Sequence, residues 1–180
     1  MSQTPLDPRM QALLDKQEIA DVLHRYCRAI DRHDVDLLRS VYFEDAIDNH
    51  GMYCGPIEGF AAYFVPGRRV WALATHHAIS NILIELDGDV ATVESYLDAF
   101  HRRQTRGGVV DDFLKCRYLD RFERRAGEWR IARRTVIYDW GKTEPAAERA
   151  WFTDLNGDFT FGSKGKSDPL YNAAWSQPVS

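Results

Sequence analysis

Hydrophobic residues near the start of the chain recur with the spacing of an amphipathic helix. Six of them fall at i, i+3, i+4, i+7, i+8 and i+11 and so share one helical face: Ile19, Val22, Leu23, Tyr26, Cys27 and Ile30. Asp7 and Pro8 supply a helix cap and a proline suited to the first helical turn. Shorter apolar clusters predict a second helix over 35–41 and a third over 57–64, with a strand over 44–50 between them.

From residue 74 onward the pattern changes to the alternation of apolar and polar residues that is typical of strands. Asp87-Gly88-Asp89 and Ala126-Gly127 have the composition of hairpin turns. The strands predicted around these turns run over 78–86, 90–103, 113–124 and 129–140. Helices followed by a run of antiparallel strands indicate an α+β fold in which the helices pack on one face of a curved sheet.

Length and charge narrow the class of protein. The chain has 180 residues, enough for one domain with a ligand cavity; we expect residues 1–143 to form that domain and residues 144–180 to form a C-terminal arm on it or on a neighbouring subunit. A net charge of −4 argues against a nucleic-acid partner. No apolar run approaches the roughly 18 residues of a membrane span, so we expect no membrane partner. The polar start and three cysteines indicate a cytoplasmic protein.

The sequence patterns of cofactor and metal sites are incomplete. Residues 160–167 resemble a phosphate-binding loop, but Thr160 stands where the first glycine belongs, and Asp168-Pro169 blocks the helix that should follow. Dinucleotide, nucleophile-elbow and paired-histidine metal patterns are missing. We therefore expect no cofactor and no metal, and chemistry carried out by side chains alone.

A carboxylate continues the apolar face of the first helix. Asp31 follows Cys27 by four residues, so it lies either exposed at a fraying helix end or inside a pocket. In a pocket it needs a hydrogen-bonding partner, and His77, among apolar neighbours, is the natural one. Such a pair fixes the imidazole tautomer and leaves the second ring nitrogen as a general base. Tyr26 is either a packed core residue or a donor to a developing oxyanion.

Other polar residues interrupt the predicted strands. Asn81 and Asp98 either bond to a neighbouring strand or face a pocket, and together with Tyr96 they are candidate substrate-binding residues. Three arginine pairs alternate with acidic residues and are expected to form solvated cross-strand ion pairs. These pairs are Arg102-Arg103, Arg124-Arg125 and Arg133-Arg134.

The order of elements and five short motifs resemble the SnoaL-like branch of the nuclear transport factor 2-like superfamily, over about residues 12–140. The motifs are Tyr26-Cys-Arg-Ala-Ile-Asp31, Phe43-Glu-Asp-Ala46, Gly55-Pro56-Ile-Glu-Gly59, His77-Ala-Ile-Ser-Asn81 and Tyr118-Leu-Asp-Arg-Phe-Glu-Arg-Arg-Ala-Gly-Glu-Trp129. The resemblance implies a cone-shaped α+β fold, in which a strongly curved antiparallel sheet packs on three N-terminal helices around a pocket. The superfamily contains both enzymes and non-enzymes, so function must be argued from the site.

Scytalone dehydratase, bile-acid 7α-dehydratase and hexachlorocyclohexane dehydrochlorinase belong to this branch and use an Asp–His pair for elimination. Lyases that remove formaldehyde from lignin-derived diaryl compounds belong to it too. Asp31 and His77 match the pair, and Tyr26 matches the tyrosine five residues before the aspartate in the bile-acid enzyme. The adjacent His76 leaves the choice of histidine open, although the spacing to Asn81 favours His77.

The resemblance therefore implies a cofactor-independent lyase, a dehydratase or a deformylating carbon–carbon lyase, in aromatic compound catabolism. Its substrate would be a small hydroxylated aromatic or polycyclic compound, and its subunits would form a homodimer or homotrimer. Two alternatives stay open. One is a ketosteroid-isomerase-like enzyme that shifts a proton without losing a group. The other is a non-catalytic module that binds a small hydrophobic molecule.

Overall fold

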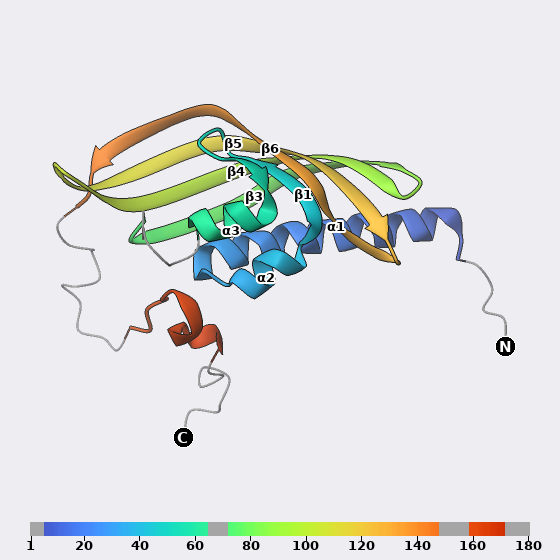
Figure 1. The fold of residues 1–180 in the computed structure, drawn as a ribbon, viewed down its shortest axis with the longest axis horizontal. Helices are drawn as coiled ribbons and strands as arrows, with labels where there is room; N and C mark the ends of the chain where they lie inside the picture. Colours follow the sequence, from blue (N-terminus) through green and yellow to red (C-terminus); the bar gives the residue numbers. More distant parts are fainter. Residues whose placement is uncertain (1–5, 65–71, 148–158, 172–180) are drawn as a thin grey trace, which may run out of the picture.

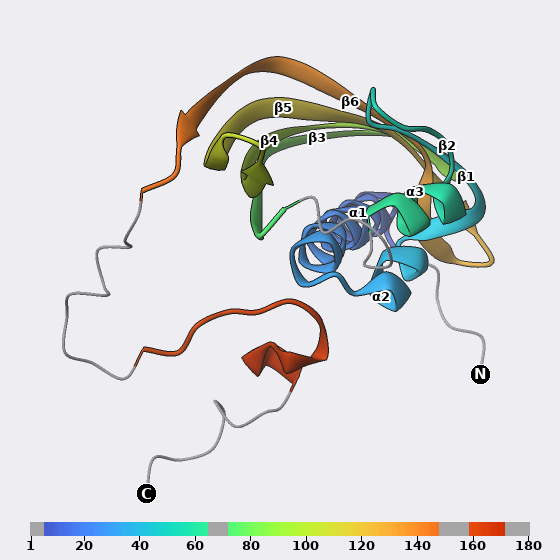
Figure 2. The same cartoon turned by 60° about the vertical axis from the view of Figure 1, so that its left-hand side comes forward.

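The computed structural model describes residues 6–64, 72–147 and 159–171. A curved six-stranded sheet arches over three helices, which all lie on its concave side (Figures 1 and 2). The predicted α+β fold is confirmed: three helices pack on a strongly curved, unclosed sheet. The elements are α1 (Pro8–Arg32), α2 (Val35–Ser40), β1 (Tyr42–Asn49), β2 (Cys54–Pro56), α3 (Ile57–Phe64), β3 (Ala74–Asp87), β4 (Val90–Thr105), β5 (Gly108–Arg125) and β6 (Glu128–Pro145).

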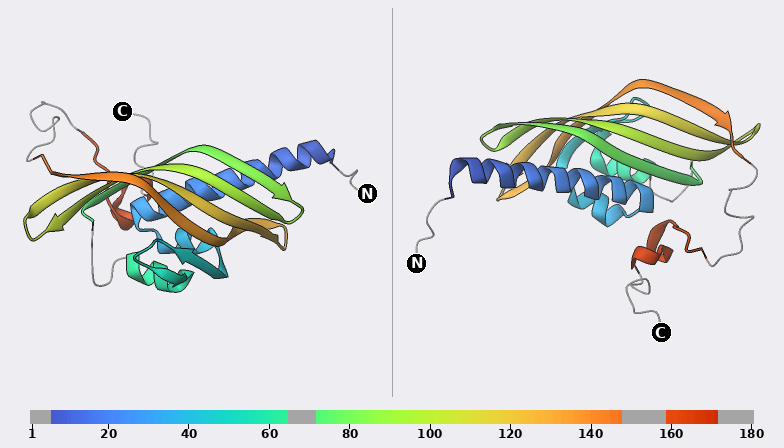
Figure 3. Two further views of the ribbon diagram at one scale, coloured as in Figure 1. Left: turned by 90° about the horizontal axis from the view of Figure 1, so that it is seen from above. Right: turned by 180° about the vertical axis from the view of Figure 1, so that it is seen from behind.

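Helix α1 begins and ends where its sequence directs. The Asp7 side chain accepts a hydrogen bond from the Arg9 backbone N–H at 2.8 Å, and Pro8 occupies the first turn. His33 closes the helix in the left-handed conformation, with a φ of 53°. The predicted apolar stripe is buried against the sheet, and α1 runs the length of the concave face (Figure 3). Among the described residues, no helix is both long and apolar enough to span a membrane.

Strands β3 to β6 pair antiparallel in sequence order, as predicted, and Ala126-Gly127 turns one of these hairpins with positive φ at both residues. The sheet as a whole is mixed, however, in the order β2-β1-β6-β5-β4-β3, because β1 lies parallel to β6. The expectation of a wholly antiparallel sheet is corrected by this one pair. Short β2 pairs with β1 at one edge of the sheet, and α3 follows it in the chain before β3, which forms the opposite edge.

Two bulges set which side chains face the helices around the cavity. In β3, Asn81 and Ile82 together oppose the single residue Ser95 of β4, and Asn81 takes a left-handed φ of 47°. In β6, Ala132 is an extra residue between Ile131 and Arg133, whose partners are adjacent in β5; a third bulge lies further along, between Tyr138 and Trp140. Because side chains alternate across a strand, each extra residue exchanges the inner and outer faces beyond it.

The segment 159–171 contacts the end of the helical layer. Asp168 lies 3.2 Å from the Arg32 guanidinium, and the Tyr171 hydroxyl donates to Asp34 at 2.7 Å. Strand β6 runs to Pro145, two residues past the expected domain boundary at 143. The contacts tie part of the 144–180 segment to α1 and to the start of α2.

Candidate active site

A hydrogen-bonded Asp–His pair joins α1 to β3. Asp31, one residue before the end of α1, accepts from the His77 ring Nδ1 at 2.7 Å and from the His77 backbone N–H at 2.9 Å. Both side chains are nearly buried, at 10% and 7% exposed. Burial alone raises the pKa of Asp31, but the bonds from His77 outweigh it and hold that pKa below its usual value. The carboxylate therefore stays ionised and selects the His77 tautomer that carries its proton on Nδ1.

A second histidine meets the free edge of the His77 ring. His101, on β4, places its Nε2 3.4 Å from the Nε2 of His77, with ring centroids 5.2 Å apart. Burial, followed by the proximity of His77, lowers the pKa of His101 to about 3, so this ring is neutral at physiological pH. With the His77 proton held on Nδ1, the Nε2 of His77 carries the only basic lone pair of that ring. This lone pair can act as a base when the neutral His101 carries its own proton on Nδ1 and so donates nothing to His77.

Tyr26 bonds to a third histidine on the wall of the same site. Its hydroxyl lies 3.2 Å from the Nε2 of His50, whose Nδ1 bonds to the fully buried carboxylate of Asp48. The Tyr42 hydroxyl donates to the other oxygen of Asp48 at 2.6 Å. Burial raises the pKa of Tyr26 well above its usual value, so its phenol stays protonated. A second Asp–His pair thus stands behind Tyr26.

A buried ion pair supports Tyr26 from beneath. Arg134 donates two hydrogen bonds to Asp120, at 2.7 and 2.6 Å, and neither side chain is exposed. The guanidinium carbon lies 4.0 Å from the centre of the Tyr26 ring and 3.9 Å from that of Tyr118. Burial favours the neutral form, but Asp120 and the adjoining phenols hold the pKa of Arg134 well above its usual value. The expectation that Arg134 forms a solvated pair is wrong, because the β6 bulge turns it inward.

The two Asp–His pairs share one cavity of about 580 Å³, within the range of small-molecule sites. Its apolar and aromatic walls suit a ring-bearing compound. Its polar groups include three histidines, two tyrosine hydroxyls, Gln104, and the ion pair of Arg103 and Asp112, whose partners lie on adjacent strands. The lining residues are Tyr26, Ile30, His50, Met52, Phe60, His77, His101, Arg103, Gln104, Asp112, Leu114 and Tyr138.

The structure does not bring the three expected substrate-binding residues to this cavity. Tyr96 is 46% exposed and Asp98 pairs with Lys115, both on the outer face of β4, because the inward positions of that strand are odd-numbered. Asn81 is exposed at the β3 bulge. His76 also points outward, next to Asp98 on a shallow outer pocket, so geometry favours His77 over its neighbour.

Sequence reasoning missed His101, His50 and Asp48. The sequence did contain a signal for His101. Every second residue of β4 from Ala91 to Ala99 faces inward, and His101 is the next residue in that series. Asp48 and His50 are two residues apart and therefore share a strand face. Among the described residues, no group of three or more potential ligands is arranged to hold a metal ion.

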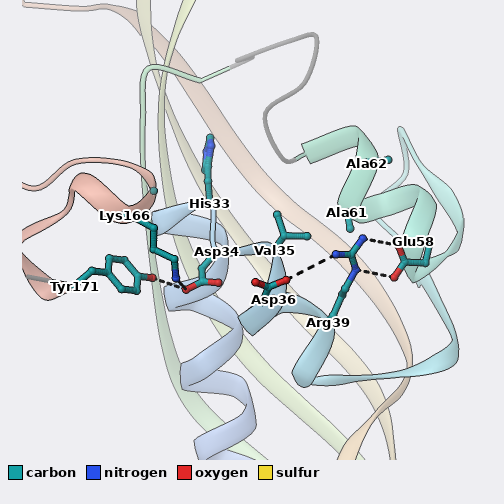
Figure 4. Close-up of a pocket in the computed structure, with 11 residues that line it drawn as sticks. His33, Asp34, Val35, Asp36, Arg39, Glu58, Ala61, Ala62, Lys166 and Tyr171 are labelled. Atoms are coloured by element: carbon teal, nitrogen blue, oxygen red, sulfur yellow. Dashed lines mark hydrogen bonds and ion pairs between the residues drawn. The ribbon is translucent and has the colours of Figure 1, made fainter.

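A second cavity, of about 620 Å³, opens between α2, α3 and the segment 159–171 (Figure 4). Its charged side chains are already paired: Arg39 donates two bonds of 2.8 Å to Glu58, and Asp34 accepts from Tyr171. It contains none of the site residues predicted from the sequence. We therefore place the candidate active site in the cavity of the two Asp–His pairs.

Comparison with protein families and solved structures gives one family and one fold. The family model described as SnoaL-like domain matches residues 11–135. A protein assigned as a scytalone dehydratase from Novosphingobium aromaticivorans is 22% identical, with a TM-score of 0.64 over 77% of this chain and 92% of its own. The hexachlorocyclohexane dehydrochlorinase LinA-type3 from Novosphingobium barchaimii is 16% identical, with a TM-score of 0.69 over 79% and 98%.

A substituted form of the protein Rv3472 from Mycobacterium tuberculosis, whose function is described as unknown, is 25% identical, with a TM-score of 0.62 over 76% of this chain and 78% of its own. No protein of curated function matches the sequence. The two enzyme structures are too distant in sequence to show more than a shared fold.

Proposed function

Because the chain belongs to the SnoaL-like domain family, a family of small-molecule-processing enzymes, we propose that it is a lyase that removes water or formaldehyde from a small hydroxylated aromatic compound. The observation that carries the proposal is the 2.7 Å bond between Asp31 and His77 at the wall of an aromatic-lined cavity. A simple binding module has no need of a buried carboxylate that orients an imidazole into its ligand site. The structural neighbours that bear the names of a dehydratase and a dehydrochlorinase support an elimination.

The bond between His77 and Asp31 supports the following roles in this reaction. The Nε2 of His77 removes a proton from the carbon beside the C–O bond, and the electron pair of that C–H bond forms the new C=C bond. The C–O bond breaks, and the departing oxygen takes a proton from the Tyr26 hydroxyl. For formaldehyde release, His77 instead takes the proton of a hydroxymethyl O–H. The C–C bond then breaks, and its electron pair forms the alkene as a neighbouring hydroxyl departs with the same Tyr26 proton, so this route releases water together with formaldehyde.

The test is a turnover assay on the purified protein with a chelator present. The panel contains the aldol adduct of benzaldehyde and acetone, which can lose water, and a hydroxylated diaryl propanediol, which can lose formaldehyde. New conjugation is followed by ultraviolet absorbance, and the product mass identifies the lost group. A product of unchanged mass would identify an isomerase instead, and a ligand that raises the Tm without conversion would identify a binding module.

His76 and His77 form a matched pair of variants for this assay. We expect His77→Gln to lower kcat by roughly 100-fold or more, since general-base catalysis supplies about that factor. We expect His76→Gln to retain activity within a factor of a few, because His76 faces outward. If the two variants behave alike, His77 is not the base.

A further inference from the structure

A second Asp–His pair contacts the cavity without a place in the reaction so far. Asp48 is fully buried on β1, and its two oxygens bond to Tyr42 and to the His50 ring. The side chain of His50 is 12% exposed, lies in the cavity wall and stacks on Phe60 at 4.5 Å between ring centroids. This pair is separate from that of Asp31 and His77, with which it shares the cavity.

The charge balance around Asp48 favours a protonated His50. A buried carboxylate needs a compensating charge or its burial is costly. The nearby cation, Arg134, is already taken by Asp120 through two hydrogen bonds. Tyr42 offers Asp48 only a neutral hydroxyl, so an imidazolium at His50 is the charge that balances it. Among the described residues, the titratable and charged groups near His50 include Asp48 on β1, Tyr26 on α1, Tyr118 and Asp120 on β5 and Tyr138 on β6, and Arg134 lies over the ring of Tyr26.

The protonation of His50 sets the direction of the Tyr26 hydroxyl. A neutral His50, with its proton on Nδ1 towards Asp48, accepts the Tyr26 O–H at Nε2, and the phenol has no hydrogen left for a substrate. A protonated His50 donates from Nε2 to the Tyr26 oxygen, and the Tyr26 hydrogen is then free to point into the cavity. The 3.2 Å separation fits either arrangement.

We propose that Tyr26, His50 and Asp48 form a proton-donating relay, with His50 as the stored acid and Tyr26 as the group that touches the departing oxygen. The inference rests on the proposed function and extends it to the leaving-group side. As the C–O bond breaks, the oxygen takes the Tyr26 proton, and the Tyr26 oxygen takes the Nε2 proton of His50, which becomes neutral. The proton gained by His77 returns to His50 through solvent after product release. The favoured substrates are therefore those with a poor leaving group, such as hydroxide, that departs only with a proton.

Leaving groups of different basicity separate the relay from a structural role. The aldol adduct of benzaldehyde and acetone must lose hydroxide, whereas its para-nitrophenyl ether loses a phenolate that departs unaided. We expect His50→Gln to lower kcat roughly 100-fold or more on the alcohol and less than about 10-fold on the ether. His77→Gln should impair both, and His24→Gln, an exposed histidine of α1, should impair neither. Equal losses by His50→Gln on both compounds would overturn the relay.

Tyr26→Phe removes a single oxygen and should show the same selectivity between the alcohol and the ether. It keeps the relay testable if His50→Gln does not fold. Nuclear magnetic resonance of ¹⁵N-histidine-labelled protein tests the relay without any substrate. We expect His50 to carry a proton on both ring nitrogens in the wild type and on only one of them in Asp48→Asn. A His50 that stays neutral throughout refutes the relay. If the wild type converts neither the alcohol nor the ether but His50 is protonated, the result counts against the proposed function and not against His50 as the stored acid.

Discussion

The buried ion pair of Arg134 and Asp120, which lies next to Tyr26 in the cavity wall, offers a test of how much this pair stabilises the fold. Neither side chain is exposed, and the guanidinium packs against the Tyr26 and Tyr118 rings as well as bonding to Asp120. Arg134→Met removes the cation and leaves an uncompensated buried carboxylate, which costs about 3–5 kcal/mol of the free energy of unfolding. The lost ring contacts add about 0.5–2 kcal/mol each.

The reciprocal variant, Asp120→Leu, leaves the arginine packed against the Tyr26 and Tyr118 rings, so we expect a smaller loss of stability than for Arg134→Met. The double variant Asp120→Leu/Arg134→Met replaces both charges with apolar groups of similar size, and such replacements are often nearly neutral. We therefore expect it to recover most of the stability, with a coupling energy of at least about 2 kcal/mol. Urea unfolding of the four proteins, followed by tryptophan fluorescence, gives the free energies. Single-variant losses that simply add in the double variant would refute a charge pair as the stabilising feature.

Three further predictions use other groups in the fold. The pKa of Asp31 is lowered in the folded state, so its contribution to stability is present above the unfolded pKa of about 3.9 and is lost as pH falls through the folded pKa. The urea concentration at the unfolding midpoint should therefore fall less steeply at acid pH in Asp31→Asn than in the wild type. An unchanged fall at acid pH would contradict this. Burial raises the pKa of the Cys27 thiol to about 12 and that of Cys116 to about 11, whereas Cys54 is exposed. A disulfide reagent should therefore react with one thiol in the native protein and with three in urea. Fast reaction of all three thiols without urea would contradict this. Gly127 has a φ of 84°, so Gly127→Ala should cost about 1 kcal/mol in the same urea assay, and no loss would show that the turn relaxes.

Local patterns in the sequence determined most of the elements. The stripe from Ile19 to Ile30 predicted α1, because a 3.6-residue repeat buries one helical face whatever that face packs against. The alternation after residue 74 predicted the strands of the antiparallel run, and Ala126-Gly127 predicted a hairpin turn. The same reasoning placed Asp31 at the end of that stripe and named His77 as its hydrogen-bonding partner, and the resemblance matched the pair to the Asp–His pair of the family.

The tertiary structure decided which polar groups meet in the cavity, and the two bulges are the physical reason. Without the extra residue in β6, alternation from Trp129 and Ile131 would turn Arg133 inward; with it, Arg134 reaches Asp120 and the tyrosines. The extra residue in β3 leaves Asn81 exposed. An extra residue in one strand is defined by its pairing with the next, a contact between segments distant in sequence, so local periodicity does not reveal it. Burying an arginine likewise requires partners from several elements, which only the folded chain brings together.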